Sequence, residues 1–257
     1  MSNASPFDRL TIRRTLIAVL LLVLSAASLG ASKPAPAKAA AIVDQGSLGI
    51  FQSGQRVGTE TFIIRQYPDS SVTSSELHSE NAQAEGKIEQ TSELTLLPDG
   101  SLSRYEWKQL APVRSSAVVE AKDQFLTMQV TADGKTTDQA FFLTQTAFVL
   151  DDYFFSTREV LLWRYLASSC KRRPGGDGCD LERTRFAILI PRRHTSSQVF
   201  IEFKGYDNTP MNGRPQRLRH FLMQTEGADW HLWLDADQKL VRISIPDTNT
   251  EILRQEK

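Results

Sequence analysis

The 257-residue sequence has only two cysteines and four histidines, and its longest apolar run is too short to cross a bilayer comfortably. It also lacks a Gly-x-Ser-x-Gly elbow, a His-Glu-x-x-His helix and a phosphate-binding loop, the patterns that position a nucleophile, a zinc ion or a nucleotide. We therefore predict no enzymatic activity, no catalytic residues, no cofactor and no metal site.

The N-terminus follows the plan of a secretory signal. Arg9, Arg13 and Arg14 precede the apolar stretch Leu16–Ala27, and small residues suitable for cleavage follow it. We interpret residues 1–31 as a signal peptide or N-terminal membrane segment and residues 32–45 as a Pro/Ala-rich linker, which leaves one folded domain at 46–257. The protein should then be periplasmic or otherwise exported. The alternative is a chain anchored in the inner membrane by an uncleaved N-terminal segment.

Charge is balanced, with 30 basic and 30 acidic residues. Without residues 1–39 the counts become 25 and 29, a net charge of −4. This balance disfavours nucleic acid as a partner. Membrane contact is expected only through the N-terminal segment.

Short stretches with alternating polar and apolar residues, separated by turn residues, dominate the chain. In Ile88–Leu97, Leu94 and Leu96 fall on one face and Thr91 and Glu93 on the other, which is typical of an antiparallel strand with one face in water. The strands predicted before residue 150 are Leu48–Gln52, Val57–Arg65, Val72–Ser79, Ile88–Leu97, Leu102–Leu110, Ser116–Ala121, Phe125–Thr131 and Thr136–Leu143. Those predicted after residue 185 are Phe186–Ile190, Gln198–Tyr206, Gln216–Gln224, Trp230–Asp235, Lys239–Ile245 and Glu251–Leu253.

One long helix is predicted near 152–169. Ser156 and Glu159 have capping-box spacing, which favours a start at Ser156; a start capped by Asp151 or Asp152 is the alternative. An apolar stripe, interrupted only by Arg158, would contain Phe154, Phe155, Leu161, Leu162, Tyr165 and Leu166.

Val160 and Trp163 fall outside this stripe, so the helix is apolar on more than one side. Such a helix must be covered on more than one side. We expect a curved sheet to wrap around it.

The two cysteines, Cys170 and Cys179, directly follow this helix. In an exported protein the pair favours a disulfide. The alternative is a metal or redox site, which needs further ligands or a Cys-x-x-Cys spacing that the pair lacks.

Two histidines could come close together. His220 and His231 lie on either side of a turn at Gly227, and Asp235 shares a strand face with His231. A zinc site or a general-base pair could be built from these side chains. The favoured alternative is that they are ordinary strand residues.

Four stretches carry a family resemblance: GIFQSGQRVGTETFII, LDDYFFSTREVLLWRYL, FAILIP and WLDADQKLVRISIP. Over about 46–254 the chain resembles a family of exported bacterial proteins of unknown function, whose architecture is similar to the periplasmic lipoprotein-carrier fold. Together with the strand pattern, this implies a mainly β (α+β) fold, a large antiparallel open or half barrel of about 11–14 strands wrapped around one central helix. The shared motifs are structural, so the resemblance implies a fold and no activity.

Cations late in the chain suggest a ligand. Three groups of cations could lie on one rim and form a basic lip around an aromatic groove, which suits an amphiphile with an anionic head. They are Lys171, Arg172 and Arg173; Arg192, Arg193 and His194; and Arg214, Arg217 and Arg219. Scattered solvated charge is the alternative. The candidate ligand-binding residues are Phe155, Trp163, Arg192, Arg193, Arg219 and Trp233.

The function predicted is that of a non-catalytic, exported cell-envelope protein that binds a lipid or other amphiphile in an open β-barrel. An envelope protein is a further candidate partner. The alternative is a structural or interaction scaffold with a self-filled barrel, and a hydrolase using His220 or His231 ranks third.

Overall fold

The computed structural model describes residues 40–79, 87–122, 125–144, 146–173, 176–179, 182–211 and 214–255. The predicted signal segment at 1–31 and residues 32–39 of the predicted linker lie outside the described residues. Internal contacts divide the chain into Met1–Ala37 and Lys38–Lys257, and all described elements belong to the second unit.

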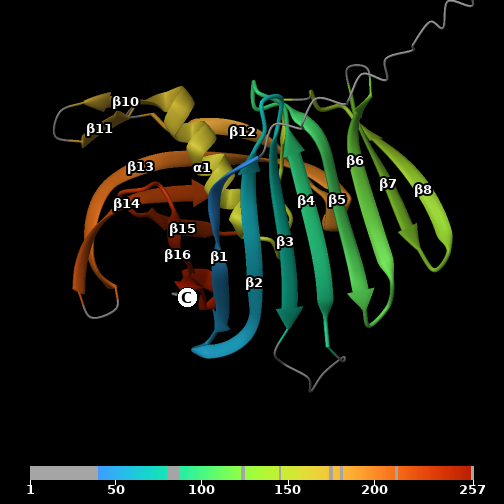
Figure 1. The fold of residues 1–257 in the computed structure, drawn as a ribbon, viewed down its shortest axis with the longest axis horizontal. Helices are drawn as coiled ribbons and strands as arrows, with labels where there is room; N and C mark the ends of the chain where they lie inside the picture. The colour runs from blue at the N-terminus through green and yellow to red at the C-terminus, as the bar shows by residue number, and fades with distance from the viewer. Residues whose placement is uncertain are drawn as a thin grey trace, which may run out of the picture. The chain divides into compact units, whose positions relative to one another are not determined.

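The described strands of the first and second halves of the chain form a single large sheet, in which the first strand is an interior strand (Figure 1). The first strand pairs with the second on one side and with the last strand on the other. Successive hairpins then build the first half of the sheet, with bounds β1 Ala41–Gln52, β2 Gln55–Gln66, β3 Ser71–Ser79, β4 Glu89–Leu96, β5 Leu102–Ala111, β6 Ser115–Lys122, β7 Phe125–Ala132 and β8 Lys135–Phe141.

The second half of the sheet runs outward from the C-terminus, in the order β17-β16-β15-β14-β13-β12-β9. Its bounds are β9 Phe148–Val149, β12 Thr184–Ile190, β13 Thr195–Met211, β14 Arg214–Gln224, β15 Asp229–Leu234, β16 Leu240–Ile245 and β17 Thr250–Gln255. Two short 3-10 helices, η1 (Pro191–Arg193) and η2 (Pro246–Thr248), interrupt it. Neighbouring described strands are antiparallel except β9 and β12, and β8 and β9 form the two open edges.

The predicted fold class is confirmed: an antiparallel half barrel contains one helix, α1 (Ser156–Ser169), between its two halves (Figure 1). All fourteen strands expected from the sequence are present, and β9 makes the described sheet fifteen-stranded. Local turn chemistry explains the tight hairpins. At Ser53-Gly54 and Asp133-Gly134 both turn residues have positive φ, the geometry that matches the twist of the flanking strands.

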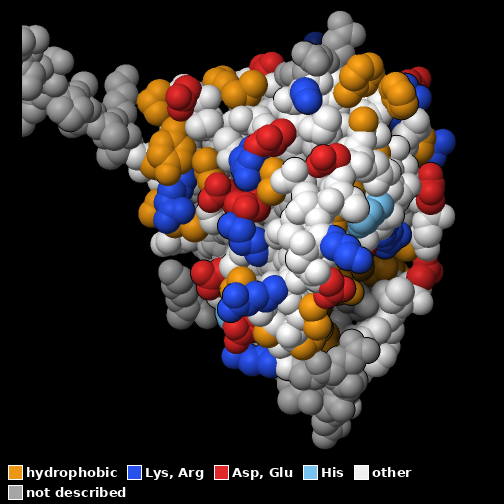
Figure 2. Space-filling view, turned by 90° about the vertical axis from the view of Figure 1, so that its right-hand side faces the viewer, with side chains coloured by type: hydrophobic (Ala, Val, Ile, Leu, Met, Phe, Trp, Pro, Cys, Tyr) orange, Lys and Arg blue, Asp and Glu red, His pale blue; other side chains and the backbone are white. Residues whose placement is uncertain are grey.

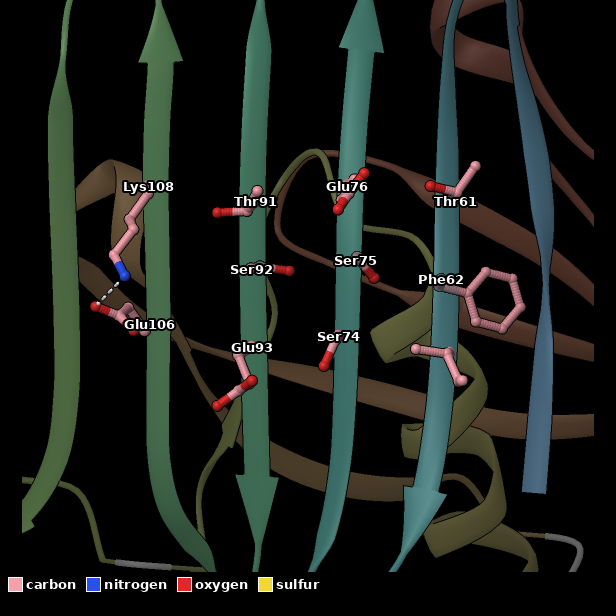
Figure 3. A pocket seen from close by; sticks show the side chains of 11 residues that line it. Thr61, Phe62, Ser74, Ser75, Glu76, Thr91, Ser92, Glu93, Glu106 and Lys108 are labelled. Carbon is pink, nitrogen blue, oxygen red and sulfur yellow. Dashed lines mark ion pairs between the residues drawn. The ribbon is translucent and has the colours of Figure 1, made fainter. Parts of the chain in front are cut away.

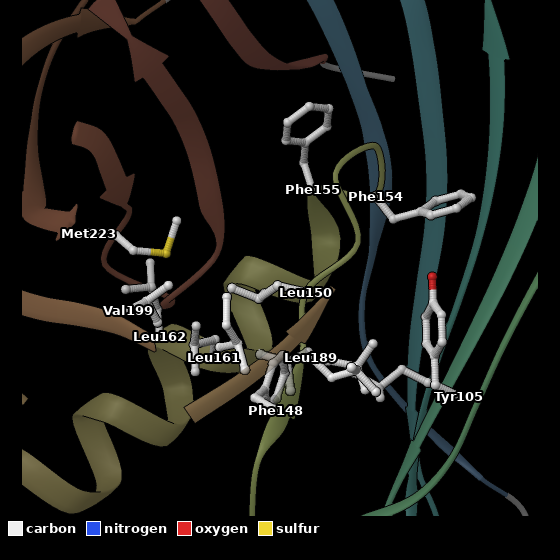
Figure 4. Close-up of a cluster of buried hydrophobic side chains, with 14 of the residues drawn as sticks. Tyr105, Phe148, Leu150, Phe154, Phe155, Leu161, Leu162, Leu189, Val199 and Met223 are labelled. Atoms are coloured by element: carbon white, nitrogen blue, oxygen red, sulfur yellow. The ribbon is translucent and has the colours of Figure 1, made fainter. Parts of the chain in front are cut away.

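The core lies where α1 meets both halves of the sheet. Leu161, Leu162 and Tyr165 are at most 1% exposed. The two leucines lie among Val199 and Met223 of the second half, with Phe148 nearby (Figure 4). Off the apolar stripe, Val160 is also buried and Trp163 packs against the core. The helix is therefore covered on more than one side, as predicted.

The capping box was wrong. The helix does begin at Ser156, but its N-cap residue is Phe155 and no side chain caps it from within the helix. The Ser156 hydroxyl lies 2.8 Å from the hydroxyl of Ser75, and Glu159 Oε2 accepts a hydrogen bond from the Leu240 backbone N–H. Both side chains are used by neighbouring strands, because the start of the helix is buried inside the sheet.

The predicted linker, residues 32–45, overlaps the first strand. Strand β1 begins at Ala41, five residues before the expected start of the domain at residue 46. Residues 41–44 have no clear strand pattern of their own, but Ala41 pairs with Gln66 and Asp44 with Ile64 of β2. A long neighbouring strand thus supplies the backbone partners that extend β1.

The predicted disulfide is confirmed. Cys170 and Cys179 are bonded and pair directly across a small separate hairpin, β10 (Cys170–Arg173) with β11 (Gly176–Cys179). The hairpin follows α1 without a linker. Its first residue, Cys170, is also the C-cap of the helix, and its backbone N–H donates to Leu166 O. No helix among the described residues is long and apolar enough to span a membrane.

Candidate functional site

The N-terminal end of α1 is held by a glutamate from a distant strand. Glu60 on β2 is fully buried, and its carboxylate accepts hydrogen bonds from the backbone N–H groups of Phe155 (2.6 Å) and Ser156 (3.2 Å). The first N–H groups of a helix have no partner within it, and the positive end of its dipole favours an anion. Burial raises the pKa of Glu60, and hydrogen bonds from Ser156, Phe155 and Ser75 oppose that rise. Glu60 therefore caps the helix from outside it.

A second buried carboxylate, Asp151, fixes the turn before the helix. Its Oδ1 accepts hydrogen bonds from Arg192 Nε (2.7 Å) and the Tyr153 backbone N–H (3.0 Å), and its Oδ2 accepts one from the Tyr105 hydroxyl (3.0 Å). Burial and the nearby Asp151 charge raise the pKa of Tyr105 well above its usual value. The start of α1 is thereby tied to β5 and to η1.

A cavity of about 670 Å³ opens beside this helix start. Its volume falls within the roughly 300–1,000 Å³ range of small-molecule sites. The walls are mainly apolar side chains from both halves of the sheet and from the helix start, including Ile50, Val57, Leu77, Phe155, Trp230 and Ile245. The charged residues of the lining are Asp152, Arg192 and Arg193. The arrangement can take up an apolar group with a polar end.

The two arginines at the cavity differ in exposure. Arg193 donates from Nε and Nη2 to both carboxylate oxygens of Asp152, each at 2.8 Å, yet its side chain is 63% exposed. Arg192 is more confined, because it also donates to Gln90 Oε1 (2.6 Å) and its Cζ lies 4.1 Å from the ring centre of Trp107. An incoming anionic group would meet Arg193 first.

A buried cation lies against two aromatic walls of the cavity. The Arg158 guanidinium carbon is 4.7 Å from the ring centre of Trp230 and 5.2 Å from that of Phe155. Its Nη1 donates to the backbone oxygens of Asp151 and Phe154, both at 2.8 Å. Burial lowers the pKa of Arg158. The residue that interrupts the apolar stripe is thus 3% exposed and closes the turn before the helix.

Three of the six predicted ligand-binding residues lie together. Phe155, Arg192 and Arg193 line the cavity. The other three make their contacts elsewhere: Trp163 Nε1 donates to Gln238 O, Arg219 Nη1 to Asp235 O, and Trp233 Nε1 to Asp207 Oδ2.

The predicted basic lip is not one rim. Lys171 follows the C-terminal end of α1, whereas Arg192 and Arg193 contact residues before its N-terminal end. The helix has 14 residues and is therefore about 21 Å long. Arg217 lies over the ring of Tyr206 on β13, and the side chains of Arg172, Arg173 and Arg214 lie outside the described part. On the side of the molecule where β8 lies, basic and acidic side chains are interspersed (Figure 2).

The predicted approach of two histidines is confirmed. His220 Nε2 lies 2.9 Å from His231 Nδ1, and His220 Nδ1 lies 3.1 Å from Asp207 Oδ2. Burial lowers the pKa of His220, although the Asp207 charge opposes it. In a catalytic Asp–His pair the second imidazole nitrogen faces the nucleophile, but here it faces His231. Asp235 instead accepts the Lys239 backbone N–H in the turn. The geometry gives no support to the hydrolase interpretation.

A buried ionic cluster joins the first strand, the last strand and the helix. Arg254 Nη2 donates to both oxygens of Asp44 (2.7 and 2.8 Å), and Arg254 Nη1 lies 3.6 Å from Glu159 Oε2. Burial and the neighbouring Asp44 raise the pKa of Glu159 to about 9. In the described part of the chain, no group of three or more His, Cys, Asp or Glu residues could hold a metal ion.

A second hollow, of about 390 Å³, lies on β2–β5. Threonine, serine and glutamate side chains line it, and Lys108 pairs with Glu106 at 3.0 Å (Figure 3). Polar residues of this kind are expected on the wet face of an antiparallel sheet. The first cavity is therefore the stronger candidate site.

Sequence reasoning missed Glu60, Trp230 and Asp152 as parts of the site. One signal was available for Glu60. Glu60 lies on the same face of β2 as Gly58, Phe62 and Ile64, which the spacing of two residues predicts to be buried. A charged side chain on a buried face needs a partner. Nothing in the sequence indicated that this partner is the helix start 95 residues later.

The scan against protein-family models finds no match. The search of curated proteins likewise finds no match. Among solved structures, the chain is similar to a beta-barrel-like protein of a domain of unknown function, DUF1849, from Brucella abortus, with a TM-score of 0.48 and 7% sequence identity. The alignment covers 83% of this chain and 98% of that chain.

Proposed function

We propose that the protein is a non-catalytic, exported component of a bacterial cell envelope that binds an amphiphile in the cavity beside the start of α1. The observation that carries the proposal is the cavity itself. It is of ligand size, its walls are mainly apolar, and its charged residues lie together on η1 and the turn before the helix. Export is supported by the Arg-rich, apolar N-terminus and by the disulfide, since disulfides persist in oxidising compartments.

One exposed arginine of the lining suits an anionic head group. Arg192 pairs with the buried Asp151, and Arg193 pairs with Asp152 at the surface of the cavity. Arg193 is the exposed member of the pair and can exchange Asp152 for a carboxylate or phosphate. A fatty acid or a lysophospholipid has this combination of an apolar chain and an anionic head.

The test is calorimetric titration with a long-chain fatty acid. In Val57→Trp the new ring should fill part of the cavity and abolish measurable binding, because Val57 belongs to its wall. Thr61→Trp is the matched control, since Thr61 lies on the same strand but is exposed. Equal heats for both variants and the wild type would contradict the proposal.

The scaffold alternative rests on a separate observation. The first half of α1 is buried on all sides, with Ser156, Thr157 and Glu159 fully inaccessible, so the helix itself occupies part of the interior. If Val57→Trp raises the melting temperature and the wild type binds no amphiphile, the scaffold is the better account.

A further inference from the structure

The mouth of the cavity is bordered by exposed apolar side chains. Soluble proteins usually bury large apolar side chains in the core, so exposed ones that gather at one place mark an interaction surface. Tyr153 lines the cavity and is 50% exposed. The end of β5 exposes Leu110 (48%), and the β5–β6 turn that follows exposes Val113 (56%). Pro112, between them, belongs to the cavity lining.

The turn is attached to the cavity wall. Gln109, which lines the cavity, donates from Nε2 to Val113 O at 2.9 Å. This bond holds the tip of the turn beside the opening. The apolar tip and the cavity are therefore one continuous surface, and we call Leu110, Pro112, Val113 and Tyr153 the apolar lip.

Cations accompany the apolar lip. Arg114 directly follows Val113 and is exposed, and Arg193 is 63% exposed at the cavity. Counting the more confined Arg192, three arginines stand here against the two carboxylates Asp151 and Asp152. Apolar side chains flanked by arginines are the combination by which peripheral proteins bind anionic lipid surfaces.

We infer that the apolar lip docks on an anionic lipid bilayer, so that the cavity can exchange its amphiphile with the membrane. The inference rests on the proposed function, because it assigns a partner surface to the same cavity. The lip inserts its apolar tip among the head groups, and Arg114 and Arg193 lie over anionic lipid. The mouth of the cavity then opens directly onto the membrane surface.

The test is flotation of the purified chain with vesicles of phosphatidylglycerol or of phosphatidylcholine. The wild type should float with phosphatidylglycerol vesicles and much less with phosphatidylcholine vesicles. Val113→Glu should weaken partitioning by roughly tenfold or more, since it removes an apolar group that the lipid would bury on docking. Arg114→Gln should weaken it about fivefold, the loss expected for one cation of about 1 kcal/mol.

Leu97→Glu is the matched control. Leu97 is 40% exposed on the β4–β5 turn, at the other end of β5 from the lip, so this variant should float like the wild type. Equal loss in Leu97→Glu and Val113→Glu, or no flotation by the wild type, would overturn the inference. So would a change from dimer to monomer in Val113→Glu without any vesicle binding, because the lip would then contact a second copy.

Fatty-acid titration of Val113→Glu separates this inference from the proposed function. If the variant still binds fatty acid but the wild type does not float, the membrane surface is wrong and the cavity function stands. If the wild type floats but binds no fatty acid, the cavity function fails and the docking surface alone remains.

Discussion

Glu60 Oε2 lies 2.6 Å from the backbone nitrogen of Phe155, although 95 positions separate the two residues in the chain. The contact places the start of the only α-helix in the described residues against β2, at the wall of the cavity. A helix start without such a partner would leave buried N–H groups unpaired, which is costly. The position of the candidate site therefore depends on this carboxylate as well as on Asp151.

Replacing Glu60 should destabilise the protein strongly. Glu60→Ala leaves the N–H groups of Phe155 and Ser156 without their acceptor, and each buried donor left unpaired costs about 1–3 kcal/mol. For a domain of this size, each kcal/mol lowers the melting temperature by about 2–4 °C. Glu76→Ala, at an exposed position on the next strand, is the control for a thermal melt. Equal melting temperatures for both variants would show that Glu60 does not cap the helix.

The central position of α1 is tested by emptying one leucine site. Leu162 is 1% exposed, so Leu162→Ala should cost about 2–5 kcal/mol in the free energy of unfolding. Denaturant titration measures this cost, and Ala167→Ser, at an exposed helix position, should change it little. Arg164 would be a poor control, because its Nη1 donates to Gly100 O. A mobile lid rather than a core helix would leave both variants near the wild type.

The Glu159 cluster should make stability depend on pH. In the folded protein the pKa of the Glu159 carboxyl is raised from 4.5 to about 9. The folded state therefore holds a proton that the unfolded chain releases above pH 4.5. The contribution of Glu159 is fully present below pH 4.5 and is lost as pH rises toward 9, by at most about 1.4 kcal/mol per pH unit.

Glu159→Gln removes this titration. The amide can still accept the Leu240 N–H, so the variant should fold and show a flatter dependence of unfolding free energy on pH in this window. Glu76→Gln, which is exposed, should keep the wild-type slope. Identical slopes in all three proteins would mean that Glu159 does not hold a proton.

The disulfide should contribute to stability through the unfolded chain. Closing a ten-residue loop is worth roughly 2.7 kcal/mol by chain entropy, so the double variant with Cys170→Ser and Cys179→Ser should unfold at lower denaturant concentration. A thiol titration of unreduced, denatured wild type should find no free thiol. Two free thiols would contradict the pairing.

The two-residue alternation of polar and apolar side chains predicted most of the fold, because successive side chains of a half-buried strand point to the core and to the solvent in turn. Leu94 and Leu96 are buried while Glu93 is exposed, as the alternation required. Two-residue β9 was missed because it is too short to show a period. The capping box failed for a different reason. Its residues have the right local spacing, but Ser75 and Leu240 from distant strands bond them instead.

The candidate site was predictable only in part. Phe155, Arg192 and Arg193 were found by residue type, and the structure brings them to one cavity. Trp163 and Trp233 were chosen by the same reasoning and lie elsewhere, since aromatic bulk alone does not reveal which strand will face the helix start. The pairing of β1 with β17, which brings Ile50 and Thr250 to the same cavity, joins the first and the last described strands, which lie about 200 residues apart in the sequence.

Native mass spectrometry of the protein purified from a bacterial envelope tests the central claim most directly. The account predicts a bound species that adds the mass of a small anionic amphiphile and is released by organic solvent. The same species should be absent from Val57→Trp and retained by Thr61→Trp. A wild type that carries no added mass, while its melting temperature shows it to be folded, would contradict the assignment of the cavity as a ligand site.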